Sequence, residues 1–291
     1  MLQLKNLNRR KFLAATALAA GSVSFLGGEG FAESSAVVVV RHDIALARLP
    51  RSFDGFTIAQ LSDFHYEQFT EKPITEAVAI VNRLAPDLIV LTGDFVTSPL
   101  FELPKTLRSA ASAAEPCAAI LRKLRAREGV YAVLGNHDVA ADPGRITRIL
   151  AGHHIPVLCN RSVALERDGQ TMWLVGIDDA FIGHADLAAA LRGIPAEETT
   201  ILLAHEPDFA DRAALLPIDL QLSGHSHGGQ IWIPGLGAPW LPPLARRYPR
   251  GLYQVRDLTL YTNIGIGTIH APIRLNCPPE VTLLRLRALK G

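Results

Sequence analysis

The sequence has little cysteine and almost no net charge. Its 291 residues include three cysteines, Cys117, Cys159 and Cys277, which are too few and too widely spaced for a disulfide framework or an all-thiolate zinc site. A formal net charge of +1 argues against the basic surface on which nucleic-acid binding depends. Hydrophobic residues make up 48% of the chain, which is more than a disordered protein contains. The composition therefore excludes a disulfide scaffold and a disordered chain, and it predicts a folded protein with its own hydrophobic core.

Residues 1–32 differ in composition from the rest of the chain. Basic residues precede the uncharged run Phe12–Leu26, which at about fifteen residues is short for a membrane span of roughly twenty. The order Asn8-Arg9-Arg10-Lys11-Phe12-Leu13 resembles the twin-arginine export signal, and Ala32 suits a cleavage site. We therefore expect a signal peptide over 1–32, read by the export machinery, and one exported domain over 33–291 in the periplasm or cell envelope. An ordinary secretory signal or a retained anchor is the alternative.

Short β-branched apolar runs alternate with helical patterns along most of the chain. Apolar spacing predicts helices at 74–84 and 111–127, and a third beginning at Asp142-Pro143. Asp168-Gly169 is the expected turn of a hairpin. Strands are predicted at 56–61, 87–91, 130–134, around 157, 163–166, 171–177, 200–203, 220–222, 252–255, 259–261 and 281–286. Crossover units combined with hairpins predict a layered α/β fold with mixed sheets.

Five of the predicted strands end in side chains that suit metal coordination. Because ligand sites in open α/β sheets form at the carboxyl ends of strands, we expect these side chains to converge. Imidazole nitrogen and carboxylate oxygen bind Zn, Mn and Fe. The seven candidate ligands are too many for one ion and suit two ions that share a carboxylate. They are Asp63, His65, Asp94, Asn136, His205, His225 and His227.

The ordered motifs Asp63-x-His65, Gly93-Asp94, Gly135-Asn136-His137-Asp138, His205 and Gly224-His225-x-His227 resemble those of the calcineurin-like metallophosphoesterases. The resemblance covers residues from about 56 to 286 and implies a four-layer α/β sandwich of two mixed β-sheets flanked by α-helices. It implies two divalent ions, Mn²⁺, Zn²⁺ or Fe²⁺. The implied roles are Asp63, His65 and His227 on the first ion, Asn136, His205 and His225 on the second, Asp94 as bridge, His137 as the acid that contacts substrate, and Asp138 as the residue that orients the His137 ring.

The predicted function is hydrolysis of a phosphoric ester, most simply by a phosphodiesterase. Two ions that share a water lower its pKa toward neutrality, which provides a nucleophile for in-line attack on phosphorus. The stretch 265–280 is similar to an exported or membrane-associated bacterial branch of the family, and Arg274 within it suits either a phosphate clamp or a structural ion pair. No nucleic acid is expected as a partner.

The segment 230–253 gives a further indication of the substrate. It carries two tryptophans, several prolines and three arginines, Arg246, Arg247 and Arg250. These residues predict an apolar wall with a basic rim, which suits a lipid-linked or envelope phosphate and peripheral membrane contact. The alternative is that they only pack a long connection.

Two other functions fit parts of the sequence. Residues 224–228 match the G-x-S-x-G pattern of serine esterases at Ser226, and Asp257 and His270 follow in triad order. That pattern requires a helix after the serine, whereas 229–233 is strand-like, and it gives the aspartates of the other motifs no role. The second alternative is an exported, non-catalytic metal-binding scaffold of the same fold.

Overall fold

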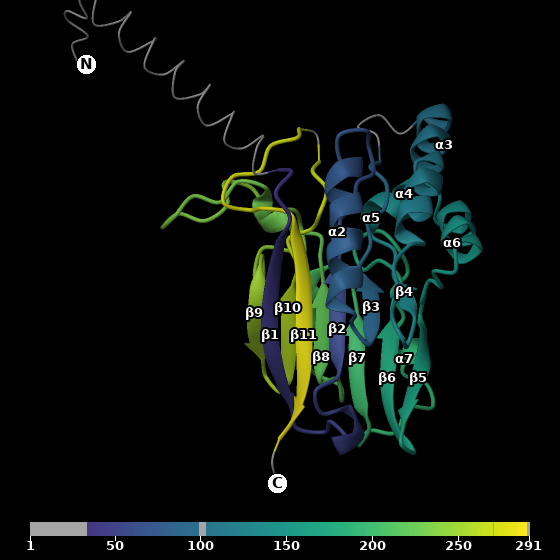
Figure 1. Cartoon of the computed structure of the whole chain (residues 1–291), viewed down its shortest axis with the longest axis vertical. Coiled ribbons are helices and arrows are strands. Elements are labelled where there is room, and N and C mark those ends of the chain that lie inside the picture. Colours follow the sequence, from purple (N-terminus) through teal and green to yellow (C-terminus); the bar gives the residue numbers. More distant parts are fainter. Residues whose placement is uncertain (1–33, 99–102, 270, 290–291) are drawn as a thin grey trace, which may run out of the picture.

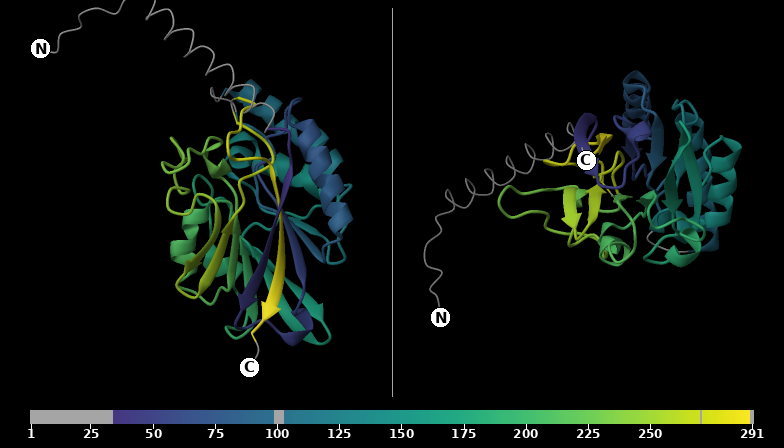
Figure 2. Two further views of the ribbon diagram at one scale, coloured as in Figure 1. Left: turned by 60° about the vertical axis from the view of Figure 1, so that its left-hand side comes forward. Right: turned by 90° about the horizontal axis from the view of Figure 1, so that it is seen from below.

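Two mixed β-sheets lie face to face, and helices cover their outer faces (Figure 1, Figure 2). The computed structural model describes residues 34–98, 103–269 and 271–289. The predicted signal peptide and His270 lie outside these residues, so the structure does not bear on them. Within the described residues, no helix is both long and apolar enough to span a bilayer.

The first sheet is parallel except between β11 and β2, and the second combines parallel pairs with two antiparallel hairpins. In the first sheet the order is β1 (Val38–Leu46), β11 (Glu280–Ala288), β2 (Thr57–Leu61), β3 (Leu88–Leu91), β4 (Val130–Ala132). In the second it is β5 (Arg161–Arg167), β6 (Gln170–Gly176), β7 (Thr199–Leu203), β8 (Leu220–Ser223), β10 (Leu258–Thr262), β9 (Gly251–Val255). The predicted four-layer α/β sandwich is confirmed.

Alternation along the strands separates the core into layers. In β3, Ile89 and Leu91 pack with the buried face of the neighbouring helices, whereas Leu88 and Val90 pack between the two sheets. A third cluster fills the outer face of the second sheet. The helices are α2 (Glu71–Leu84), α3 (Pro104–Ser112), α4 (Ala114–Leu121), α5 (Asn136–Ala141), α6 (Pro143–Gly152), α7 (Leu187–Ala190) and α8 (Ala210–Ala213), with 3₁₀ turns η1 (Arg51–Phe53), η2 (Pro207–Phe209) and η3 (His227–Gly229).

Three sequence-based predictions of elements are wrong. The helix expected over 111–127 is shorter, because α4 spans only Ala114–Leu121 and residues 122–127 are not helical. It does not continue α3, which ends at Ser112, because Pro116 lacks an N–H and its ring clashes with the carbonyl of Ser112. Residues around 157 form only an isolated bridge with Ala132. The segment 229–233, expected to be strand-like, instead contains the end of η3 and isolated bridges.

The registers bring the carboxyl ends of several strands to one end of the molecule. Leu61 pairs with Leu91, and Leu91 with Ala132, so β2, β3 and β4 end together. In the second sheet Leu203 pairs with Leu222, so β7 and β8 also end together. The loops that leave these five strands carry the predicted metal ligands, and they meet at this end.

Candidate metal centre and active site

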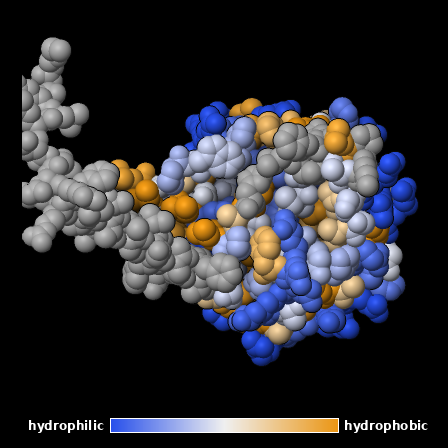
Figure 3. Space-filling model, turned by 90° about the horizontal axis from the view of Figure 1, so that it is seen from above, coloured by the Kyte–Doolittle hydropathy of each residue, from blue (hydrophilic) through white to orange (hydrophobic). Residues whose placement is uncertain are grey.

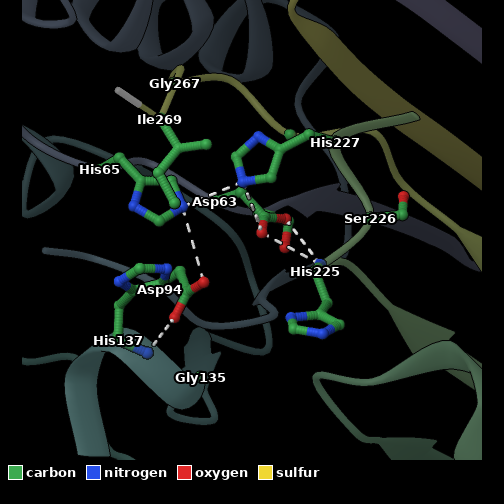
Figure 4. A network of polar contacts seen from close by, with 12 residues as sticks. Asp63, His65, Asp94, Gly135, His137, His225, Ser226, His227, Gly267 and Ile269 are labelled. Carbon is green, nitrogen blue, oxygen red and sulfur yellow. Dashed lines mark hydrogen bonds and ion pairs between the residues drawn. The ribbon is translucent and has the colours of Figure 1, made fainter. Parts of the chain in front are cut away.

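The loops after β2, β3, β7 and β8 place the predicted ligands in two adjoining groups. In one group, single ligand atoms of Asp63, His65 and His227 all lie within 4.8 Å of one another. In the other, those of Asp94, His205 and His225 do so. Each of these six residues is buried. Figure 4 shows five of them, Asp63, His65, Asp94, His225 and His227.

The carboxylate of Asp94 lies between the two groups. Its Oδ2 atom is 3.5 Å from Nε2 of His65 and 3.1 Å from Nε2 of His205, so one oxygen faces both groups. Its Oδ1 atom accepts the backbone N–H of His137 at 2.9 Å, which fixes the carboxylate in this orientation (Figure 4). The position is the one that a bridging ligand requires.

Outward hydrogen bonds orient two of the imidazoles. Nδ1 of His205 lies 2.6 Å from the carbonyl oxygen of Thr92, and Nε2 of His225 lies 2.8 Å from that of Pro243. A carbonyl only accepts, so these nitrogens carry protons and the opposite ring nitrogens present their lone pairs inward. The same arrangement orients metal-bound histidines in other proteins.

Burial keeps three of the imidazoles neutral, the form that binds metal. It lowers the pKa of His65 to about 3 and that of His225 to about 4, and it lowers the pKa of His227 well below the usual range. Burial also raises the pKa of Asp63 to about 7. These pKa shifts arise because the side chains are buried away from water. Divalent cations would balance the negative charge of the buried carboxylates.

The local geometry of the candidate ligand atoms suits a bound cation. Oδ1 of Asn136 is buried and accepts no hydrogen bond from any described residue. The inward lone pair of His205 faces the carboxylate of Asp94 at 3.1 Å, and these two acceptors repel unless a proton or a metal ion lies between them. Asn136 also lines the same cavity as Asp94 and His225. Four of the seven predicted ligands therefore line this cavity, and the other three, Asp63, His65 and His205, are grouped with them.

The backbone at this site is held in an uncommon conformation. Five of the candidate ligands have positive φ: Asp63 (51°), His65 (40°), Asp94 (56°), His225 (68°) and His227 (51°). Such non-glycine residues typically cost on the order of 1–3 kcal/mol each and gather at functional sites. Gly135 permits the close packing, since a Cβ there would lie 2.3 Å from Oδ1 of Asp94. Part of the folding energy is therefore used to position ligands.

The structure corrects the role predicted for Asp138. Its carboxylate accepts backbone N–H groups of Phe95, Val96 and Gly135 at 2.9, 3.2 and 3.0 Å, so it ties the loop after β3 to the start of α5. The ring of His137 is instead oriented by Ser98, whose N–H donates to Nδ1 at 2.9 Å and whose Oγ lies 2.7 Å from the same atom. Sequence reasoning missed Ser98, four residues after Asp94, because serine carries no distinctive signal there.

A cavity of about 390 Å³ opens beside the candidate ligands. Its lining includes the polar side chains of Asp94, Asn136, His137, His225 and His227. It also includes apolar side chains, namely Phe181, Trp240, Pro242, Pro243 and Ile269. The predicted apolar wall is therefore real at Trp240, whereas Trp232 lies under the guanidinium of Arg250, 4.3 Å from the ring centroid.

Phe181, which the sequence did not single out, is fixed by a buried carboxylate. Asp179 accepts the backbone N–H groups of Phe181, Ile182 and Gly183, and Glu206 accepts that of Ala180. The ring of Phe181 lies 6.3 Å from that of His225. Asp179 thus caps a tight loop that holds an aromatic side chain at the cavity.

The serine-esterase arrangement is not formed. Oγ of Ser226 accepts the N–H of Gly228, and the side chain points away from the imidazoles (Figure 4). Asp257 lies in the turn before β10, and because β10 runs parallel to β8, this turn is at the opposite end of the sheet from Ser226. The helix that the pattern needs is replaced by the short turn η3.

Arg274 is a buried structural residue. Its guanidinium donates to the carbonyls of Ile264, Gly267 and Cys277, and it approaches Nδ1 of His227 at 3.5 Å. These contacts tie together the loop between β10 and β11. That loop packs closely on the loop after β2, since a Cβ on Gly267 would lie 2.0 Å from the carbonyl oxygen of Phe64. The two alternatives that the sequence left open for Arg274, a phosphate clamp or a structural ion pair, stay predictions.

Comparison with known proteins identifies the class. Residues 56–229 match the family model of the calcineurin-like phosphoesterases, and the chain belongs to the calcineurin-like metallophosphoesterase family. It is accordingly a hydrolase of phosphoester bonds, and the family together with the two ligand groups indicates a binuclear site for divalent ions.

Three relatives are informative. The chain is 33% identical to the uncharacterized metallophosphoesterase YkuE of Bacillus subtilis, over 98% of this chain and 99% of the relative. It is 32% identical to the phosphodiesterase YaeI of Escherichia coli, over 96% and 99%. It is 28% identical to the UDP-2,3-diacylglucosamine pyrophosphatase LpxG of Chlamydia trachomatis, over 81% and 86%. The chain therefore resembles these proteins along most of their length.

Proposed function

We propose that the protein is a phosphodiesterase whose substrate joins its phosphate to an apolar, lipid-like group. The single observation that carries this is the cavity, in which the candidate metal ligands face a wall of Phe181, Trp240 and prolines. A phosphoryl group would lie against the polar side and its apolar substituent against the other. LpxG, by its name, acts on a diacylated nucleotide sugar, which has the same combination of groups.

We assign the residues of the site to different roles in the reaction. Asp63, His65 and His227 would hold one divalent ion, Asn136, His205 and His225 the other, with Asp94 between them. When bound, such ions withdraw charge from a phosphoryl group and acidify water at neutral pH. Ser98 holds Nδ1 of His137, and we assign Nε2 of the same ring to contact substrate. When the ring is protonated, Oγ of Ser98 can accept from Nδ1 while Nε2 passes its proton to the departing oxygen.

We also infer that the chain is exported and works in the periplasm or cell envelope, with peripheral membrane contact through residues 230–253. The twin-arginine pattern at Arg9 and Arg10 supports export of a folded domain over 33–291. A two-lysine replacement of these arginines should leave the protein in the cytoplasm. Efficient export of the replaced chain, measured by fractionation, would contradict this signal assignment.

Chelation should stop hydrolysis of a chromogenic phosphodiester, because the buried ligand groups position no nucleophile of their own. Treatment with EDTA followed by gel filtration should remove nearly all activity, and Mn²⁺, Zn²⁺ or Fe²⁺ should restore it. The measurement is release of nitrophenolate from bis(p-nitrophenyl) phosphate, with metal content determined in parallel. Activity that survives complete metal loss would favour a serine esterase, and no activity with any metal would favour the scaffold.

Shortening the apolar wall should raise KM for substrates with an apolar substituent. Phe181→Ala and Trp240→Ala each remove ring surface from the cavity, which we expect to lower kcat/KM about 10-fold for a long-chain alkyl nitrophenyl phosphodiester. The methyl nitrophenyl diester is the matched substrate control and should change little. Equal losses on both substrates would show that the wall supports the metal site and does not select substrate.

A further inference from the structure

Exposed apolar side chains gather around the mouth of the active-site cavity. Of the large hydrophobic residues exposed on the described surface, six belong to the loops that border it. They are Phe181, Ile182, Ile231, Ile233, Leu236 and Trp240. Leu236 is 83% exposed and Trp240 64% exposed, the highest values among them. In Figure 3, hydrophobic surface extends to the left, the side on which the loop after β8 projects in Figure 1. We call these six residues the apolar rim.

The part of the rim that projects farthest is a closed hairpin, residues 231–237, not a loose loop. Ile233 and Gly237 pair through two backbone hydrogen bonds of 2.9 and 2.8 Å, and Gly235 and Gly237 adopt φ of 80° and 82°. At the base, the N–H of Trp232 donates to the carbonyl of Leu275 at 2.8 Å. The backbone thus satisfies itself and holds Leu236 outward at its tip.

The start of the described chain lies at the same end as the rim. Val38 of β1 pairs with Glu280 of β11, and Thr282 of β11 pairs with Gln60 near the carboxyl end of β2. Because β1 and β11 are parallel and β11 and β2 antiparallel, β1 begins where β2 ends, at the candidate metal centre. The described chain therefore begins on the side that carries the apolar rim.

We propose that the apolar rim is the surface on which this protein docks to a lipid bilayer, with the hairpin 231–237 inserted at its tip. Aromatic and aliphatic side chains at a polar protein's edge bind interfaces in this way. Arg246 and Arg250 lie on the same segment as the hairpin, and their charge suits anionic headgroups, whereas Arg247 pairs with Asp211.

Docking in this orientation specifies how substrate arrives. The cavity mouth, bordered by Phe181 and Trp240, would face the headgroup layer, so a lipid phosphodiester could enter without leaving the membrane. This inference deepens the proposed function and rests on it for the choice of substrate. Binding itself depends only on the rim.

The first test compares binding of full-length variants to vesicles of phosphatidylethanolamine and phosphatidylglycerol. Leu236→Gln removes the hairpin tip without adding charge, and it should weaken sedimentation with vesicles about 10- to 100-fold. Leu215→Gln is the matched control, because Leu215 is 63% exposed and lies beside the β10 turn at the opposite end of the molecule. It should bind like the unmodified protein. Equal binding of all three proteins would overturn the proposal.

A second measurement reports on the hairpin itself, whatever the run 12–26 contributes to binding. In a Cys159→Ser background, an environment-sensitive fluorophore on Leu236→Cys should shift to an apolar signal with vesicles, and one on Leu215→Cys should not. A shift at position 236 that depends on protein concentration and needs no vesicles would show pairing with a second copy and would overturn bilayer docking. So would no shift at all.

The last comparison separates this inference from the proposed function. Leu236→Gln should hydrolyse soluble bis(p-nitrophenyl) phosphate at the unmodified rate, because Leu236 is outside the cavity lining. It should lose most activity on a nitrophenyl phosphodiester lipid held in vesicles. Absent activity of the unmodified protein on the soluble diester would refute the proposed function, whereas equal activity of the two proteins on vesicles would refute only the docking inference.

Discussion

Replacement of Asp94 by asparagine should lower kcat/KM for phosphodiesters by about 10³-fold, because it removes the carboxylate that lies between the two ligand groups. The amide can still accept the backbone N–H of His137 through Oδ1, so the loop geometry should persist. What disappears is the negative charge 3.1 to 3.5 Å from His205 and His65. Charge stabilisation by paired metals is worth several kcal/mol, and about 4 kcal/mol corresponds to roughly 10³ in rate.

Metal content should change together with activity in this variant. We expect Asp94→Asn to bind fewer than two ions, measured by elemental analysis after gel filtration, while its circular dichroism stays unchanged. Asp219→Asn is the matched control, because Asp219 is also a buried carboxylate but pairs with Arg48 at the opposite end of the molecule. It should lower stability and leave kcat/KM unaltered. Full metal content and near-normal activity of Asp94→Asn would show that this carboxylate does not join the two sites.

The strands that lead to the site could be predicted because they are short, apolar and followed by motif residues. Leu88–Leu91 is buried at every position, and such a run is distinct in sequence. The edge strand β1 was not predicted because its residues Arg41, His42 and Asp43 interrupt the apolar pattern, and only alternate positions near its end are buried. An edge strand pairs with only one neighbouring strand, so the apolar pattern of its sequence is weaker than that of a central strand.

The residues that support the site are also difficult to predict from the sequence. The ligand positions could be predicted because each has a side chain with distinctive chemistry, and the order of motifs matched a family. The partner of a given side chain depends on packing, so adjacency in sequence misassigned Asp138 to the His137 ring, which Ser98 contacts instead. The hairpin 231–237 is similar. Its Ile-Trp-Ile sequence is typical of a strand, but among the described residues it forms only isolated bridges, and Ile231, Ile233 and Leu236 remain exposed.

His137→Gln should keep both ions and lose most turnover on substrates with a poor leaving group. The ring lines the cavity and is oriented by Ser98, outside the two proposed sets of metal ligands, so its removal should not empty them. Proton transfer to a departing alkoxide typically contributes about 10²- to 10⁴-fold, whereas nitrophenolate leaves readily without a proton. The expected loss is therefore large for an alkyl diester and much smaller for bis(p-nitrophenyl) phosphate.

This dependence on the leaving group distinguishes an acid from a residue that only shapes the cavity. If His137 merely packs against substrate, His137→Gln should lower kcat/KM equally for all diesters, and the assignment would be wrong. His153→Gln provides the control, since His153 pairs with Glu115 on the helical face and lies outside the cavity lining. Ser98→Ala should show a weaker form of the same selectivity. The backbone N–H of residue 98 could still donate to Nδ1 of the neutral ring, whereas the hydroxyl that accepts from Nδ1 of the protonated ring would be lost.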